Sequence, residues 1–265
     1  MLFAHSYYSY KYGTVAPADL VQMAMDFGYR ELVLADVNST SASLNFVRLA
    51  QKKGLRPILG VDFRNGATPS YIGLAKNNCG FRELNTHLSY HRHTKEPIAQ
   101  EAPDYWNHCF VIYPFSNVPN RPLKKHEFIG VRPSDLPRLK FSKKRFLQEK
   151  LIALQTATFR HKRDFNAHRL LRAIDNNALL SKLPKSEEGH PADRYISIAQ
   201  FQGVYREWPE LIYNTEKLLD QCSIEFEFGD EAPHKNLKTY TGSEEEDWQM
   251  INQLAREGLP YRYPK

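Results

Sequence analysis

The chain has 265 residues, a formal net charge of +6, and 42% hydrophobic and 12% aromatic residues. This composition predicts a folded core and excludes an intrinsically disordered protein. No apolar run approaches the ~20 residues that span a bilayer. The three cysteines form no Cys-x-x-Cys pair, which argues against a disulfide framework and a cysteine zinc site. The opening residues lack the pattern of a signal peptide, so we expect a cytoplasmic protein with no membrane partner.

The first third of the chain alternates strands and helices. Residues 18–27 place apolar side chains at helical spacing, with a proline near the start and a glycine just past the end. Residues 32–34 form a continuous apolar run, typical of a strand buried on both faces. A second helix over 43–53 and a second buried strand over 57–61 follow. Two such units in sequence predict parallel strands with right-handed crossovers.

Further apolar runs continue this series. Strands are predicted at 71–75, 109–113, 128–131 and 151–154. The count favours a closed or nearly closed β/α barrel, a distorted TIM-like barrel of about seven strands, over an open sheet. In such barrels the functional residues lie where strands end at their C-terminal edge.

The composition changes after Leu183. Residues 1–183 are expected to form the barrel, and residues 184–265 a C-terminal extension of helical and extended segments. Within it, a helix is predicted from Trp208 to about Cys222, a Gly/Pro-rich extended segment over 226–241, and a helix capped by Ser243 that ends at Gly258. The last residues read as a connector toward a further part of a longer protein.

Several segments occur in the order and spacing of a known family. One is Gly54-Leu55-Arg56-Pro57-Ile58-Leu59-Gly60, and another is Pro209-Glu210-Leu211-Ile212 followed by Asn214-Thr215. The others lie at residues 5–9, 74–84, 167–174 and 254–263. The chain resembles the PHP (polymerase and histidinol phosphatase) family, and in particular the N-terminal PHP domain of bacterial DNA polymerase III alpha subunits. The resemblance covers nearly the whole chain and implies the PHP barrel fold.

An active PHP site, as the resemblance implies, gathers His, Asp, Glu and Cys ligands around several metal ions. Because neighbouring divalent ions repel each other, such a cluster needs many anionic and imidazole ligands. Carried over by position, this chain keeps His5 of an opening His-x-His pair and Asp36 of an Asp-His pair, and Asp62 replaces a glutamate. His91 or His93 is a further candidate.

Other residue types occupy the remaining ligand positions. These positions hold Phe3, Tyr12, Val37, Phe115 and the segment Thr156-Ala157-Thr158. We expect Phe3, Val37 and Phe115 to fill the former cavity, so that no tight metal cluster forms. The remnant His5, Asp36 and Asp62 would then be satisfied by hydrogen bonds. No catalytic residue, cofactor or cofactor-binding residue is predicted in this chain.

The resemblance implies a role in DNA replication. We expect a catalytically silent, structural domain that braces the rest of a polymerase III alpha chain and docks a proofreading exonuclease subunit. The parent protein would contact DNA as a DNA-directed DNA polymerase, a nucleotidyltransferase that uses Mg²⁺.

Two alternatives stay open. In the first, His5, Asp36, Asp62 and His91 or His93 hold one Zn or Mn ion in a metal-dependent phosphoesterase. In the second, an independent nucleic-acid-binding barrel uses a basic stretch, residues 159–172, because lysine and arginine attract phosphates. The candidates there are Arg160, Lys162 and Arg163. A solvated helix face explains the same charge run.

Overall fold

The computed structural model describes residues 2–229 and 239–263. It divides into two compact units, Met1–Phe226 and Glu227–Lys265. Most of the predicted extended segment at 226–241 lies outside the described residues. The predicted change of character after Leu183 stays an expectation about domain organisation. Among the described residues, no helix is both long and apolar enough to cross a membrane.

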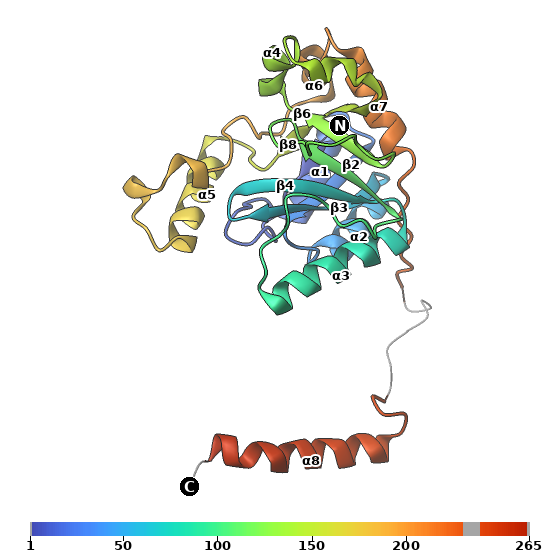
Figure 1. The fold of residues 1–265 in the computed structure, drawn as a ribbon, viewed down its shortest axis with the longest axis vertical. Helices are drawn as coiled ribbons and strands as arrows, with labels where there is room; N and C mark the ends of the chain where they lie inside the picture. The colour runs from blue at the N-terminus through green and yellow to red at the C-terminus, as the bar shows by residue number, and fades with distance from the viewer. Residues whose placement is uncertain (1, 230–238, 264–265) are drawn as a thin grey trace. The chain divides into compact units, whose positions relative to one another are not determined.

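The first unit is built on one eight-stranded sheet (Figure 1). Its strands are β1 (Leu2–Ala4), β2 (Glu31–Val37), β3 (Arg56–Asn65), β4 (Thr68–Ala75), β5 (Cys109–Pro114), β6 (Glu127–Val131), β7 (Leu151–Ala153) and β8 (Gln155–Ala157). The strand order is β7-β6-β5-β4-β3-β2-β1-β8.

The two ends of this sheet belong to one continuous stretch of chain. β7 pairs with β6, β8 pairs with β1, and Leu154 alone separates β7 from β8. The backbone N–H of Leu154 donates to Val131 O at 2.9 Å, which continues the β6 ladder across the break. The sheet therefore returns to itself as a nearly closed barrel with seven positions around its circumference. The predicted α/β barrel of about seven strands is confirmed.

All strands run in parallel except β4. β1, β2 and β3 pair in parallel, as do β5, β6 and β7, whereas β4 is antiparallel to both neighbours. Only Gly66 and Ala67 separate β3 from β4, and a parallel connection needs a dozen or more residues. A glycine with φ +60° makes this tight turn without strain. The predicted strand is present, but in the reverse direction to the barrel series.

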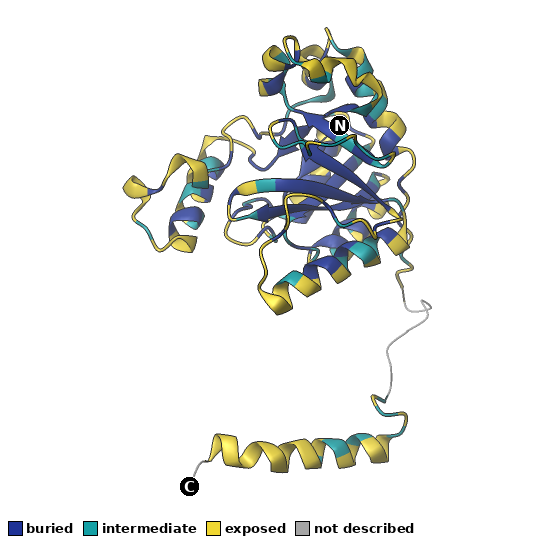
Figure 2. Ribbon diagram, in the orientation of Figure 1, coloured by how far each residue is buried: buried dark blue, intermediate teal, exposed yellow. Residues whose placement is uncertain are grey.

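Helices pack around the barrel, and the first three along the chain each bury one face (Figure 2), whereas α5 (Lys162–Asp175) stands to one side of the sheet (Figure 1). They are α1 (Pro17–Asp26), α2 (Ser43–Lys53), α3 (Asn78–Thr94), α4 (Leu136–Leu139), α5 (Lys162–Asp175), α6 (Ile198–Val204) and α7 (Pro209–Leu219). Short 3₁₀ turns lie at Pro133–Asp135, Lys143–Phe146, Gln148–Lys150, Leu180–Lys182 and Lys185–Glu187.

Alternation along the strands divides the core into an inner and an outer cluster. Phe3, Val33 and Ile58 belong to the inner cluster, whereas Leu32 and Leu59, one residue away, pack in the outer one. Because side chains of a strand point alternately to its two faces, the odd positions of β2 and the even positions of β3 face inward. This parity decides which polar residues meet at the end of the barrel.

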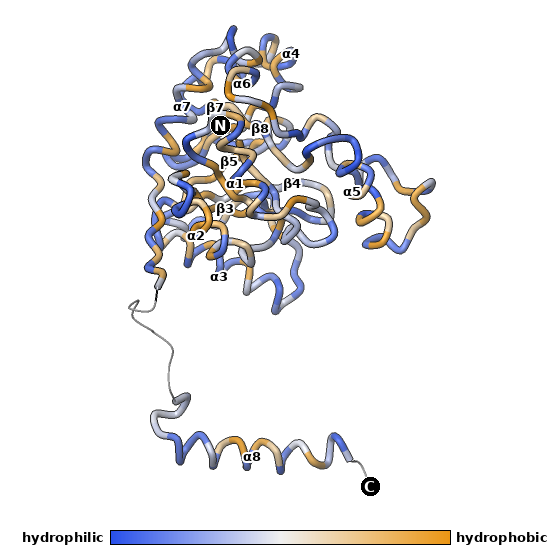
Figure 3. Tube along the Cα trace, turned by 180° about the vertical axis from the view of Figure 1, so that it is seen from behind, coloured by the Kyte–Doolittle hydropathy of each residue, from blue (hydrophilic) through white to orange (hydrophobic). Residues whose placement is uncertain are grey.

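The described part of the second unit contains the helix α8 (Glu244–Arg262) and the turn before it. Ser243 Oγ accepts the backbone N–H of Glu246 at 3.2 Å, as the predicted cap requires. The helix continues past the predicted end at Gly258 and includes Pro260. Apolar residues occur along it (Figure 3), and Trp248 is 63% exposed.

Candidate functional site

Buried polar side chains gather at the C-terminal ends of β1, β3 and β8. His5 follows β1, Asp62 lies in β3 and Thr158 follows β8, all on the inward-facing parity. His5 Nε2 lies 3.2 Å from Asp62 Oδ2, and His5 Nδ1 lies 2.9 Å from Thr158 Oγ1. A carboxylate can only accept, so the Nε2–H donates in the first contact. The structure therefore brings together two of the predicted residues, His5 and Asp62.

A guanidinium group supplies the positive charge in this cluster. Arg64 Nη2 donates to Asp62 Oδ2 at 2.6 Å, and the Arg64 side chain is only 3% exposed. Arg64 Nη1 donates to the Tyr12 hydroxyl at 2.7 Å, and the Arg64 Cζ lies 4.8 Å from the Tyr12 ring centroid. Tyr12 stands at the position where the family resemblance implies an early acidic ligand. Arg64 was not among the residues predicted from the sequence.

Both members of the Arg64–Asp62 pair are charged. Burial alone would raise the pKa of Asp62, but the charge of Arg64 and hydrogen bonds from His5 and Arg64 outweigh burial and lower that pKa. Burial would likewise lower the pKa of Arg64, and the Asp62 and Tyr12 partners raise it instead. A buried charge must be paired, since desolvating it alone is very costly.

An irregularity in β3 positions Arg64. The register between β3 and β4 shifts between Phe63 and Arg64. The side-chain amide of Asn38, just beyond β2, then pairs both backbone groups of Arg64. It accepts the Arg64 N–H at 2.9 Å and donates to Arg64 O at 2.8 Å. Asn38 has φ 47°, a left-handed conformation that asparagine tolerates better than most residues. The Asn38 side-chain amide thus takes the place of the backbone of a neighbouring strand, and it fixes the direction of the Arg64 side chain.

A second buried histidine holds Tyr12. His168, in α5, donates from Nδ1 to Tyr12 O at 2.7 Å and accepts the Gly189 N–H at Nε2, also at 2.7 Å. Its ring packs edge-on against Tyr12, with centroids 4.5 Å apart. These partners fit a neutral imidazole, and burial lowers the pKa of His168 to about 4. We call the cluster of Arg64, Asp62, His5 and Tyr12 the arginine site. His168 supports this site through its contacts with Tyr12.

Asp36 has a separate set of partners. Its carboxylate accepts the Ser6 N–H at 2.6 Å, the Ser6 hydroxyl at 2.7 Å and the Ser9 hydroxyl at 2.7 Å. Burial raises the pKa of Asp36 despite these hydrogen bonds, which favour the charged form. Asp36 thus anchors the loop after β1, whereas Asp62 pairs with Arg64.

The remaining histidine candidates lie on α3. His91 Nδ1 bonds to Glu96 O at 3.0 Å and its ring contacts His87, whereas His93 is exposed. Within residues 2–229 and 239–263, no group of three or more His, Cys, Asp or Glu side chains is arranged to hold a metal ion. The residues present therefore do not fit the metal cluster that the family resemblance implies.

The predicted apolar filling of the pocket needs correction. Phe3 does belong to the inner cluster. Phe115 packs in a different cluster with Ile129 and Leu139, so the prediction that it fills this pocket is wrong. Val37 is only half-buried. At this end of the barrel the guanidinium of Arg64 contacts Asp62 and Tyr12.

The predicted nucleic-acid candidates lie at the start of α5 and just before it. Arg160 is bound by Asp164 Oδ2 at 2.8 Å and by Asp19 Oδ2 at 3.3 Å, so its charge is largely compensated. Lys162 and Arg163 are exposed on the helix surface. The structure does not gather these three cations around a groove.

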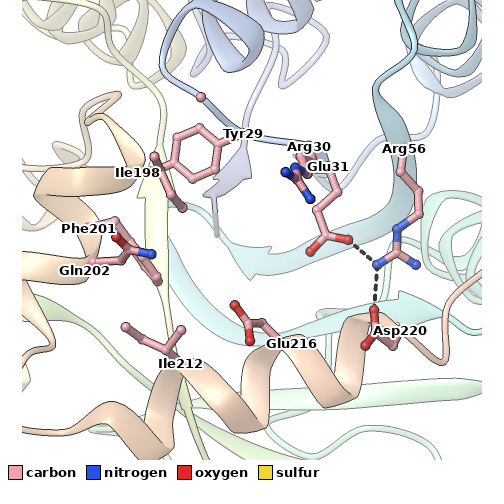
Figure 4. A pocket seen from close by; sticks show the side chains of 11 residues that line it. Tyr29, Arg30, Glu31, Arg56, Ile198, Phe201, Gln202, Ile212, Glu216 and Asp220 are labelled. Carbon is pink, nitrogen blue, oxygen red and sulfur yellow. Dashed lines mark hydrogen bonds and ion pairs between the residues drawn. The ribbon is translucent and has the colours of Figure 1, made fainter.

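A cavity of about 510 Å³ opens at the opposite end of the barrel, where β2 and β3 begin (Figure 4). Arg56 bonds to both Glu31 and Asp220 on one side of it. Phe201 and Ile212 line the other side. Glu31 and Arg56 are the first residues of β2 and β3, whereas Asp36 and Asp62 lie toward the other ends of the same strands. This cavity is therefore distinct from the arginine site.

The first strands of the barrel lie in the part of the chain that matches a known protein family. The PHP domain family matches residues 2–112, which include β1 to β4, the first part of β5, and both His5 and Asp62. The resemblance to the PHP family is confirmed. Beyond residue 112, the resemblance rests on individual relatives.

Several curated relatives are DNA polymerase III alpha subunits. The protein from Bacillus subtilis is 24% identical over 98% of this chain and 26% of its own length. The protein from Aquifex aeolicus is 20% identical over 98% of this chain and 27% of its own length. The chain thus spans about a quarter of the length of the curated relatives it matches. A solved putative metal-dependent phosphoesterase from Bifidobacterium adolescentis aligns over 83% of this chain and 95% of its own, with 10% identity and a TM-score of 0.36.

Proposed function

We propose that this chain is a PHP-type domain of a DNA polymerase III alpha protein in which an arginine takes the place of the metal ions. The domain would have no hydrolytic activity of its own. Similarity to replicative polymerase subunits over nearly the whole chain supports the assignment to DNA replication. Its role would be to brace the polymerase body.

One observation carries this proposal: the buried Arg64 guanidinium lies 2.6 Å from Asp62 Oδ2, the same oxygen that His5 Nε2 contacts. Metal-dependent phosphoester hydrolysis needs a divalent ion that polarises the phosphate and activates water. An ion bound at Asp62 would have to displace a desolvated cation, and like charges close together repel strongly in a low-dielectric interior. Arg64 also has no acceptor to activate water, because a guanidinium only donates.

A turnover assay tests the loss of hydrolysis. The purified 265-residue chain is incubated with Mn²⁺ or Zn²⁺ and bis(p-nitrophenyl) phosphate, beside His5→Ala and Asp62→Asn variants. We expect the three proteins to release p-nitrophenol at the same background rate. Turnover by the wild-type chain that both variants abolish would instead support a mononuclear phosphoesterase and reject the proposal.

The parent protein and its partners form the second part of the proposal. The parent would be a cytoplasmic DNA-directed DNA polymerase, a nucleotidyltransferase that uses Mg²⁺, and this domain would dock a proofreading exonuclease subunit. The polymerase III alpha relatives support it. Size-exclusion chromatography of the chain with the exonuclease subunit of the same organism should give a stoichiometric complex. Separate elution of the two proteins at micromolar concentration would contradict the docking role.

A further inference from the structure

A groove of about 690 Å³ lies at the end of the barrel opposite to His5. It runs between the C-terminal end of β4, the starts of β5 and β6, and α7. Four lysines and one glutamate line it, so its net charge is positive. These lysines are Lys76, Lys125, Lys150 and Lys217.

Two of the lysines are fixed against the aromatic wall of the groove. Lys76 Nζ lies 4.5 Å from the Phe110 ring centroid, and Lys150 Nζ lies 5.3 Å from that of Phe128. Lys150 also donates to Lys124 O at 2.6 Å. Ring faces and backbone carbonyls hold these ammonium groups in place. Within residues 2–229 and 239–263 neither Lys76 nor Lys150 forms an ion pair, although Glu127 and Glu149 attract Lys150 from farther away.

The other two lysines are free to bind a ligand. Within residues 2–229 and 239–263, neither Lys125 nor Lys217 makes an ion pair or a side-chain hydrogen bond. Tyr213, on the same wall of the groove as Lys217, is 64% exposed. The partly buried His126 lies among the cations: burial lowers its pKa, and Lys76, Lys124 and Lys150 lower it further against the opposing effect of Glu127. The groove therefore combines unpaired cations with an exposed aromatic ring.

We propose that this groove binds single-stranded nucleic acid. Lysines that line a groove attract successive phosphates, and exposed aromatic rings stack on bases whatever their sequence. An acidic polypeptide would use the same cations, but it would gain little from the exposed ring of Tyr213. The site differs from the basic stretch at α5 and does not depend on the arginine site, so it stands or falls separately from the proposed function.

Fluorescence anisotropy with a labelled oligothymidylate tests the proposal on the full 265-residue chain. Affinity should fall with salt, and four phosphate contacts would give a slope of about −3 in a plot of log affinity against log salt concentration. The Lys125→Ala/Lys217→Ala variant should bind more weakly, with a slope smaller by about 1.4. Tyr213→Leu, which keeps all charges, should weaken binding about fivefold or more.

A matched control separates the groove from overall charge. Lys162→Ala/Arg163→Ala removes two exposed cations from α5 and should leave the affinity unchanged. Circular dichroism verifies that each variant is folded. Loss of binding in this control but not in the groove variants would overturn the proposal. So would competition by poly-glutamate as strong as by unlabelled oligothymidylate, together with no effect of Tyr213→Leu, because that outcome indicates an acidic polypeptide.

Discussion

Arg64 and Asp62 lie two residues apart in β3, and the Arg64 guanidinium donates a 2.6 Å hydrogen bond to the Asp62 carboxylate at the end of the barrel. Both side chains are almost fully buried. The remnant ligand site is thus neutralised from within the chain. Tyr12 and His168 extend the cluster toward α5, so the pair is part of a connected polar network rather than an isolated ion pair.

Replacing Arg64 should strongly destabilise the protein. In Arg64→Ala, Asp62 would remain buried without its cation, and removing one partner of a buried pair costs about 3–5 kcal/mol. Urea unfolding at neutral pH measures this loss. Asp62→Asn/Arg64→Met, which removes both charges, should be more stable than Arg64→Ala.

An exposed arginine provides the control. Among the residues that the structure describes, the exposed side chain of Arg48 on α2 bonds only to Asn45. Arg48→Ala should therefore change the free energy of unfolding by less than about 0.5 kcal/mol. If Arg64→Ala were as mild as Arg48→Ala, the buried pair would not have the role assigned to it.

Stability should fall with acid in a window set by His168. Its folded pKa is about 4, below the ordinary value of 6.5. The unfolded chain therefore binds the proton first, and the free energy of unfolding decreases as pH falls from about 6.5 to 4, by up to ~3 kcal/mol. Asp62, whose pKa is lowered, should add its own loss only below about pH 4.

Variants at His168 isolate this contribution. Measured from pH 7 to 4, the unfolding free energy of His168→Gln should be lower at neutral pH but less dependent on pH than that of the wild type. The difference in slope should approach one proton. His87, whose pKa is also lowered to about 4 by burial, keeps its own dependence in both proteins. Identical slopes would show that His168 is not held neutral in the fold.

Thr215 should matter for the attachment of α7 to the barrel. Its fully buried hydroxyl accepts the Ala153 N–H at 2.9 Å and donates to Leu211 O at 2.6 Å. Thr215→Val keeps the shape but leaves a buried backbone N–H without an acceptor, which should cost about 1–3 kcal/mol. Thr215→Ser keeps the hydroxyl, so most of the loss should be absent from its thermal unfolding curve. Equal losses in the two variants would indicate that packing of the threonine methyl dominates.

The periodic elements of the fold could be predicted from the sequence because their signals are local. Apolar spacing indicated α1 and α2 almost to the residue, and continuous apolar runs indicated β2 and β3. The closure of the barrel was harder to see. β8 is a three-residue strand that follows β7 after a single residue. No turn in the sequence of residues 151–157 indicates that β7 pairs with β6 whereas β8 pairs with β1.

The site was only partly predictable for a different reason. His5 and Asp62 were found because their types match metal ligands, and their contact follows from strand parity. Arg64 was not predicted because the candidates were residue types that bind metal ions, and arginine is not one of them. The alternation Asp62-Phe63-Arg64 in an apolar strand was the available signal, since it places both charges on one face. Asp36 was expected to be a remnant satisfied by hydrogen bonds, and the serines of the β1 loop provide them.

The most direct test of the arginine site is anomalous X-ray scattering from crystals of the chain grown with Mn²⁺ or Zn²⁺. We predict no metal peak within about 2.5 Å of His5 Nε2 or the Asp62 carboxylate, and density for the Arg64 guanidinium against Asp62. One or more ions bound there, with Arg64 displaced, would contradict the account.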